Sequence, residues 1–320
     1  MTESAATTAS NDSALVSVIM ATYAGDSPKL FEQAVGSVQA QTHDHFEFLI
    51  VLDGPVGRET QSFLDRLTLH DDRIQVLPRP ENEGAATARN HGIDRAVGDY
   101  IAILDADDLA IPERLERQLA FLEEKQADLV GSFYRLIDES GAIIGKREVP
   151  MTPQGIRNSF CVFNPIANST VLARASVLKK TPYPQRYQFA RSYAAGHNHN
   201  QQTGIGRLNP LRLLFASADK CIEFEDCELW IQLLRQKRLL LNQDEYLVLF
   251  RNDERFLARR TGLRYFGREF RCKLTSVPLY PIVLAPAVIV IMLASSLPRL
   301  LPVRLLRTLY VIRGFMRFGN

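Results

Sequence analysis

The stretch YIAILDADD, residues 100–108, decides the fold and places the first candidate site. An apolar run is followed at once by three carboxylates, Asp105, Asp107 and Asp108. Such a run is typical of a buried strand, and ligands of an open α/β sheet bind beyond the carboxyl ends of its strands. Three crowded carboxylates repel one another, so we expect a compensating cation, and Mg²⁺ or Mn²⁺ with a diphosphate is the natural candidate. The alternative is a solvated turn in which an aspartate caps the next helix.

Apolar runs alternate with helical patterns on both sides of this stretch. This alternation predicts βαβ units, and therefore an α/β fold with a mainly parallel sheet and helices on both faces. Predicted strands cover residues 15–22, 46–52, 74–77, 100–104 and 128–133, and predicted helices cover residues 28–41, 57–69, 84–97 and 112–125. Beyond Pro150 the alternation stops, with a strand at 169–173, an aperiodic stretch at 183–219, a helix at 226–235 and an extended segment at 239–250.

The composition is that of a globular protein: 320 residues, of which 46% are apolar and 23% are charged. It excludes a wholly disordered chain and a collagen-like fibre. The four cysteines show no C-x-x-C spacing, which favours reduced thiols in a cytosolic compartment over a disulfide framework. Residues 1–14 are small, polar and acidic, and we interpret them as a disordered tail without a secretory signal.

The charge is divided unevenly along the chain. From Arg255 onward there are 12 Lys/Arg and one acid, a net charge of +11, whereas residues 1–254 carry a net charge of −9. Residues 274–298 contain no charge and are long enough to cross a bilayer, although Pro278, Pro281 and Pro286 weaken the prediction of a straight helix. The alternative is a buried core helix. We expect residues 255–320 to associate with a membrane surface, by spanning it, re-entering it or lying flat on it.

Further candidates stand at the ends of strands and the starts of helices. Asp53 ends the second strand, where a carboxylate can bind a nucleotide base or ribose or make an Asx turn. Tyr23 ends the first strand and can stack on a base or pack within the protein. Arg89 lies one turn inside a helix that opens with small residues, where it can contact a phosphate or stay solvated. Asp226 opens the helix DCELWIQLLR, where an anionic carboxylate suits either a general base or an N-cap.

Five motifs in one order resemble the family 2 glycosyltransferases of the GT-A type, over residues 15–251. They are VSVIMATY at 16–23, SVQAQTHDHFEFLIVLDG at 37–54, NEGAATARNHGI at 82–93, GDYIAILDADDL at 98–109 and FEDCELWIQLL at 224–234. The resemblance implies an inverting transfer from a nucleotide-sugar donor, which we expect to be UDP-linked. Two departures from the family pattern are Ala24 after Tyr23, and Leu52 in place of the first aspartate of the D-D-G turn.

The resemblance also implies a role for each candidate residue. Tyr23 and Asp53 would contact the base of the donor, and Arg89 its base or phosphate side. Asp105 would hold the ribose or complete the metal shell, and Asp107 would bind the divalent metal, Mg²⁺ or Mn²⁺. Asp226 would be the catalytic base that takes the proton of the acceptor hydroxyl.

We therefore expect a GT-A domain over residues 15–253, with a nucleotide-sugar half at 15–125 and an acceptor half at 126–253. A basic, membrane-associating region follows at 254–320. The expected protein is a metal-dependent glycosyltransferase that extends a lipid-linked or cell-surface glycan at the cytoplasmic face of a bacterial inner membrane.

Three competing functions are weighed against this one. A catalytically inactive scaffold would bind only nucleotide or membrane, and the intact aspartates argue against it. A sugar nucleotidyltransferase usually has a Gly- and basic-rich loop after its first strand, where this chain has TYAGDSPK. Nucleic acid is the less favoured partner of the basic region, because the neighbouring apolar segment favours lipid.

Overall fold

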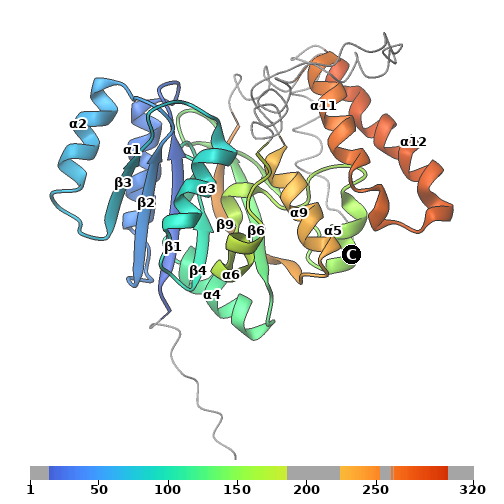
Figure 1. Ribbon diagram of the computed structural model, residues 1–320, viewed down its shortest axis with the longest axis horizontal. Helices are drawn as coiled ribbons and strands as arrows, with labels where there is room; N and C mark the ends of the chain where they lie inside the picture. Colours follow the sequence, from blue (N-terminus) through green and yellow to red (C-terminus); the bar gives the residue numbers. More distant parts are fainter. Residues whose placement is uncertain (1–13, 186–223, 253–260, 262, 302–320) are drawn as a thin grey trace, which may run out of the picture.

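A computed structural model of the chain describes residues 14–185, 224–252, 261 and 263–301. Nearly all of the predicted tail, most of the aperiodic stretch and the end of the basic region lie outside these residues. The described strands form one nine-stranded sheet in the order β3-β2-β1-β4-β8-β6-β9-β5, and β7 pairs with β6 (Figure 1). They are β1 (Val16–Thr22), β2 (Phe46–Leu52), β3 (Ile74–Pro78), β4 (Tyr100–Ile103), β5 (Leu109–Ala110), β6 (Leu129–Ile137), β7 (Ile143–Arg147), β8 (Leu172–Arg174) and β9 (Leu240–Arg251).

The helices follow the strands in the alternation that the sequence predicts. The α-helices are α1 (Pro28–Gln39), α2 (Arg58–Leu67), α3 (Ala85–Arg95), α4 (Arg114–Glu124), α5 (Pro153–Ser159), α6 (Ala175–Lys180), α9 (Glu225–Arg235), α11 (Leu263–Leu274) and α12 (Ala285–Ser296). Short 3₁₀ helices are η2 (Asn168–Thr170), η3 (Val277–Leu279), η4 (Ile282–Leu284) and η5 (Leu297–Leu300).

The first half of the sheet is parallel throughout. β1 pairs with β2 and β4, and β2 pairs with β3, all in parallel register. All seven residues of β2 are buried, which explains why six of them are apolar, since parallel strands are covered on both faces. The four strands therefore end at one edge of the sheet.

The second half of the sheet is mixed. β8 lies antiparallel between β4 and β6, and β9 is parallel to β6 but antiparallel to the short β5. The predicted mainly parallel sheet is thus observed for β3-β2-β1-β4, and the complete sheet is mixed. Apolar spacing shows that a strand is buried but does not give its direction. The sequence therefore could not predict that β8 is antiparallel to its neighbours.

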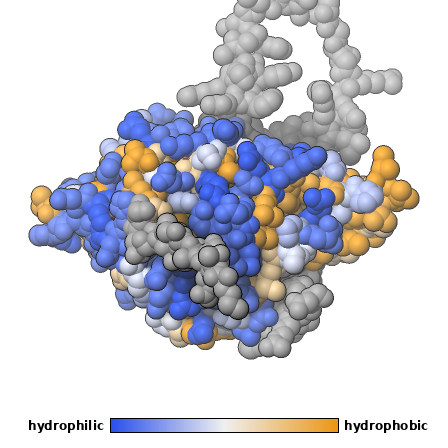
Figure 2. Space-filling view, turned by 90° about the horizontal axis from the view of Figure 1, so that it is seen from below, coloured by the Kyte–Doolittle hydropathy of each residue, from blue (hydrophilic) through white to orange (hydrophobic). Residues whose placement is uncertain are grey.

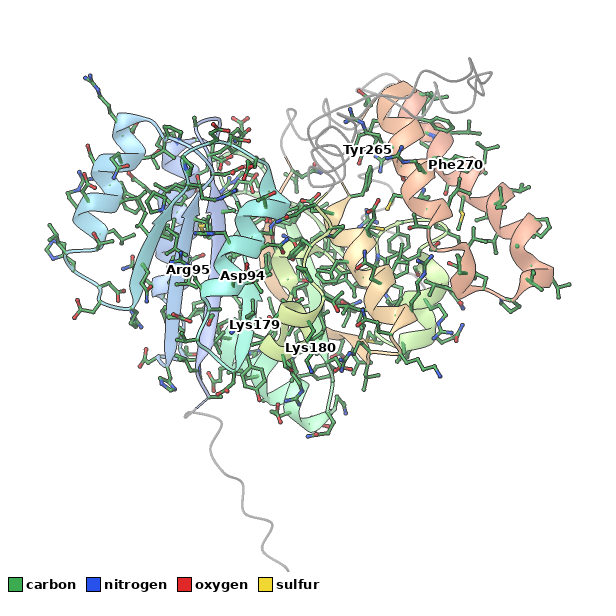
Figure 3. The ribbon with its side chains drawn as sticks, viewed as in Figure 1. Asp94, Arg95, Lys179, Lys180, Tyr265 and Phe270 are labelled. Carbon is green, nitrogen blue, oxygen red and sulfur yellow. The ribbon has the colours of Figure 1, made fainter. Side chains whose placement is uncertain are left out.

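Helices cover both faces of the sheet, as the sequence predicts. One core contains Phe31 of α1, Leu64 of α2 and Leu119 of α4. The core on the other face contains Ile93 of α3 and Trp230 of α9. On that face α3 and α6 lie side by side (Figure 3), and the Lys179 ammonium of α6 donates to the Ala96 carbonyl at 2.7 Å.

The last described helices lie at one end of the molecule. α11 and α12 run beside each other, next to α5 and α9 and far from α2 (Figure 1). Val288 and Met292 of α12 pack against Cys161 and against Phe270 of α11. The uncharged segment is therefore attached to the body of the protein.

Candidate active site

The candidate site lies at the carboxyl edge of the parallel half of the sheet. β2, β1 and β4 are neighbours that run in the same direction, and Thr22 pairs with Leu52 at the ends of β1 and β2. Tyr23, Asp53 and Asp105 follow these three strands within two residues. The fold therefore brings the three side chains to one edge, where ligands of such sheets bind.

The carboxylate of Asp53 is buried and fixes a loop. Its Oδ1 accepts from Nη1 of Arg79 and from the Glu83 N–H, both at 3.0 Å, and its Oδ2 accepts from the Gly84 N–H at 2.8 Å. Gly84 precedes α3 with a φ of +94°, a conformation that favours glycine. Asp53 thus makes no Asx turn, because its backbone donors belong to the distant loop that starts α3.

Tyr23 presents an aromatic ring at the same edge. The ring is folded back over Gly25, where an added Cβ would lie 2.5 Å from Cε2 of Tyr23. Asp26 holds the turn, since its Oδ2 accepts from the Thr22 hydroxyl at 3.0 Å and from the Tyr23 N–H at 3.1 Å. The tyrosine is 40% exposed, so a ligand at this edge of the sheet can reach it.

The three aspartates after β4 have different surroundings. Oδ1 of Asp105 accepts from Nη2 of Arg89 at 2.7 Å and from Nδ2 of Asn168 at 2.9 Å. Asp107 is exposed. Asp108 is buried, accepting from the Ser169 hydroxyl and from the Arg251 N–H. Burial, and then the charges of its two aspartate neighbours, raise the pKa of Asp108.

Arg89 connects the aspartate loop to helix α9. Its guanidinium is buried, and while Nη2 donates to Asp105, Nη1 donates to Oε1 of Glu225 at 2.7 Å. Burial opposes the charge, but the carboxylates of Asp105 and Glu225 raise the pKa of Arg89 above its ordinary value. The arginine is therefore a permanent cation between two acidic motifs, and the solvated alternative does not apply.

Asp226 lies in the first turn of α9, directly after Glu225. The residue before the helix is Phe224, so Asp226 is not the N-cap. Its Oδ2 accepts from Nδ2 of Asn164 at 2.8 Å, and its Oδ1 accepts from the Cys227 N–H at 2.7 Å. The helix N-terminus favours the anionic carboxylate, as a general base requires.

Sequence reasoning missed several side chains that organise this region. Asn164 and Asn168 orient Asp226 and Asp105. Asn168 in turn accepts from the Tyr183 hydroxyl at 2.7 Å. The Arg251 guanidinium donates to the carbonyl of Asp107 at 2.9 Å. No motif marked these residues, because each acts through a contact between segments far apart in the chain.

The donor set fits a divalent cation bound together with a diphosphate. No group of three His, Cys, Asp or Glu side chains able to hold a metal occurs among the described residues. Mg²⁺ is commonly bound by one or two carboxylates plus substrate phosphates rather than by a complete protein cage. The exposed Asp107 carboxylate, with Asp105 two residues before it, provides such a partial set of oxygen ligands.

The fold is shared with two solved structures. TarS 1–349 of Staphylococcus aureus has a TM-score of 0.54 at 18% identity, over 89% of this chain and 71% of that one. The mannosyltransferase PcManGT of Pyrobaculum calidifontis, solved with GDP-Man and Mn²⁺, has a TM-score of 0.54 at 14% identity, over 94% and 81%. At these identities the likeness shows the fold alone.

The sequence comparisons name a family. The chain is 33% identical over 184 residues to the uncharacterized glycosyltransferase MJ1057 of Methanocaldococcus jannaschii, which is 57% of this chain and 63% of that protein, less than two thirds of its length. It is 23% identical over 303 residues to the amylovoran biosynthesis glycosyltransferase AmsE of Erwinia amylovora, 92% of this chain and 98% of AmsE. The model of glycosyl transferase family 2 matches residues 17–181, more than half of the chain. The match spans the parallel strands and the aspartates at their ends, and the chain therefore belongs to glycosyltransferase family 2, with the GT-A fold.

Proposed function

We propose that this glycosyltransferase is inverting and metal-dependent, with Asp226 as its catalytic base. One observation carries the proposal: the Arg89 guanidinium donates to both Asp105 and Glu225. Asp107 lies two residues from Asp105, and Asp226 is the neighbour of Glu225. The proposed metal ligand and the proposed base therefore belong to two segments that one side chain joins.

The chemistry needs one base in a single displacement. The acceptor oxygen attacks the anomeric carbon, its proton passes to the carboxylate of Asp226, and the bond to the nucleoside diphosphate breaks. Asn164 orients the carboxylate for this transfer. No second carboxylic acid is required, in contrast to the pair that glycoside hydrolases use.

Asp107 and Asp105 are the residues that would hold Mg²⁺ or Mn²⁺. The ion would supply Lewis-acid neutralisation of the charge on the departing diphosphate. Tyr23 and Asp53 stand at the same edge of the sheet and are proposed to contact the base of the donor, Tyr23 by stacking. We still propose that Arg89 lies beside the donor. It would act on the donor through Asp105, to which its guanidinium donates.

We further propose a UDP-linked donor and a lipid-linked or cell-surface glycan acceptor, at the cytoplasmic face of a bacterial inner membrane. TarS has been solved with UDP, and AmsE is named for the biosynthesis of amylovoran. Residues 255–320 consist of an uncharged segment with basic residues on both sides. This pattern supports a membrane surface as partner, because anionic headgroups attract arginine clusters.

The test is donor use by the purified full chain. Nucleoside diphosphate release is measured with a panel of UDP- and GDP-sugars, with Mg²⁺ or Mn²⁺ and a lipid extract as acceptor source. Asp226→Asn should lower the transfer rate about 100-fold or more, because general bases contribute that much, and Asp107→Asn should abolish transfer, because the proposed metal ligand is lost. Asp94→Asn, an exposed change on α3, is the control and should leave the rate unchanged.

The outcomes separate the competing functions. An Asp226→Asn protein with full activity removes Asp226 from the mechanism. Nucleotide binding without release of a nucleoside diphosphate favours the inactive scaffold, and release of pyrophosphate from a nucleoside triphosphate favours the nucleotidyltransferase.

A further inference from the structure

An exposed apolar surface lies at the end of the molecule formed by α11 and α12. It consists of the exposed large apolar side chains of η4, α12 and η5, among them Ile282, Val283 and Val290, and we name it the apolar ridge. Ile282 and Val283 are 87% and 84% exposed. Figure 2 shows hydrophobic residues gathered at the end where Figure 1 places these helices. Residues Ile282–Leu300 are long and apolar enough to cross a membrane. Only 17% of this apolar segment is buried inside the protein, which excludes a core helix.

The opposite face of α12 is docked on the protein. Val288, Met292 and Ser296 are buried at spacings of four residues, so they form one stripe along the helix. The Lys273 ammonium of α11 donates to the Ser296 hydroxyl at 3.1 Å, and the Ser295 hydroxyl donates to the Cys161 carbonyl at 3.0 Å. Apolar packing and hydrogen bonds thus hold α12 to two different segments.

Charged groups are built into this docking. Glu269 of α11 is buried and accepts from Lys273 at 2.8 Å and from Arg299, which follows α12. To cross a bilayer, α12 would have to carry α11 and these charges to hydrocarbon depth, or leave its docked face and unpair them. Either alternative is unfavourable. Ionised groups are costly at hydrocarbon depth, and a buried charge that loses its partner is costly as well.

The chemistry around the ridge favours lipid as its occupant. Residues 274–298 contain no charge, and the chain beyond them is basic, with Arg304, Arg307, Arg313 and Arg317. A bilayer with anionic headgroups offers hydrocarbon to the ridge and negative charge to the arginines at the same time. A helix that is apolar all round and uncovered on most sides is otherwise found in lipid.

We propose that the apolar ridge is an in-plane membrane seat: it enters one leaflet of an anionic bilayer while α12 stays docked on the catalytic domain. The seat also reaches the candidate active site. Tyr265 lies on the side of α11 that faces the domain, and Phe270 on the side toward α12 (Figure 3). The ring of Tyr265 lies 5.3 Å from that of Phe224, the residue before Glu225. The membrane contact and the helix of the proposed base thus form one packed unit.

The first test is binding of the full chain to vesicles of phosphatidylethanolamine and phosphatidylglycerol. The double variant Val283→Glu/Val290→Glu should lower the partition coefficient about tenfold or more, because each valine loses its transfer into hydrocarbon. The control Leu69→Glu/Val97→Glu changes two residues that are 78% and 73% exposed elsewhere on the molecule, and it should bind like the unsubstituted protein. Both variants alter exposed positions only, and circular dichroism checks that they fold.

The second test distinguishes a seat from a span. Ile282→Cys and Leu300→Cys are each labelled with an environment-sensitive fluorophore, added to sealed vesicles, and exposed to an impermeant reductant outside, with the unsubstituted protein as background. An in-plane seat predicts that both fluorophores are bleached. Protection of either one would mean that the segment spans.

Unchanged vesicle binding by the ridge variant overturns the proposal, and if that variant also turns a dimer into a monomer, the ridge is a subunit interface. Sugar transfer is not measured, so these results are independent of the proposed activity.

Discussion

Arg89 is the residue that joins the two acidic segments of the site. It lies buried between Asp105 and Glu225 and donates to each through a different terminal nitrogen. A guanidinium fork can serve two carboxylates at once, whereas the point charge of a lysine suits only one of them. The arginine therefore sets the distance between the aspartate loop and α9.

We predict that Arg89→Lys lowers kcat about tenfold or more, because small displacements of catalytic groups are costly. The free energy of unfolding should fall by about 3 kcal/mol, the low end for breaking a buried ion pair. Steady-state kinetics and urea unfolding check the two effects. The matched control is Arg73→Lys, whose guanidinium bonds Asp71 in the loop between α2 and β3, and it should leave kcat unchanged. Equal kcat in both variants would contradict a positioning role for Arg89.

The sequence could predict that Tyr23, Asp53 and Asp105 meet at one edge, because parallel strands end together. It could not predict the partners of these residues. The bond of Arg89 to Glu225 and that of Asn164 to Asp226 cross between distant segments. Such contacts depend on how α9 packs on the sheet, and no local pattern encodes that packing.

At the scale of elements, β9 ends in a buried arginine that ties three segments together. The Arg251 guanidinium donates to the carbonyls of Asp107, Asp138 and Glu139, and to Oε1 of Gln33. These bonds fasten the aspartate loop to the turn between β6 and β7 and to α1. The exposed Asp107 thus lies on a loop whose backbone is fixed by the Arg251 side chain.

Arg251→Met should lower the free energy of unfolding by about 3 kcal/mol, since the buried arginine makes several part-buried hydrogen bonds that are lost together. If the enzyme is metal-dependent as proposed, this substitution should also raise the concentration of Mn²⁺ needed for half-maximal activity, because the backbone of Asp107 is no longer fixed. The control is Arg135→Met, at an exposed position on β6, with an expected change within about 0.5 kcal/mol. An unaltered metal requirement would show that the loop needs no such support.

Periodicity predicted the elements of the parallel half closely. The strand at 46–52 was confirmed to the residue as β2, and the helix predicted at 84–97 is α3 (Ala85–Arg95). β7 (Ile143–Arg147) was missed, because it is a partly exposed hairpin strand without alternating apolar residues. The order of β8, β6 and β9 was also beyond prediction, since long-range pairing determines it.

At the scale of the molecule, the buried stripe of α12 makes this helix an integral layer of the protein rather than a loose appendage. Met292 is fully buried under the helix, whereas the adjacent Leu293 is 43% exposed. We predict that Met292→Ala lowers stability in mild detergent by about 2–3 kcal/mol, from lost packing and the cavity it leaves.

Leu293→Ala removes a similar apolar volume from the exposed side of α12 and serves as the matched comparison. Thermal unfolding of the two proteins should show a clear decrease in Tm for Met292→Ala and little change for Leu293→Ala. Equal melting temperatures would mean that α12 is detached from the body in detergent.

The contact between Tyr265 and Phe224 has a practical consequence for preparing this enzyme. Removing everything after residue 253 would uncover Phe224 and Cys227 at the start of α9, because α11 packs on both. Exchanging the outward valines and isoleucines of η4 and α12 for polar residues, with the chain kept at full length, reduces the exposed apolar surface and leaves this packing intact.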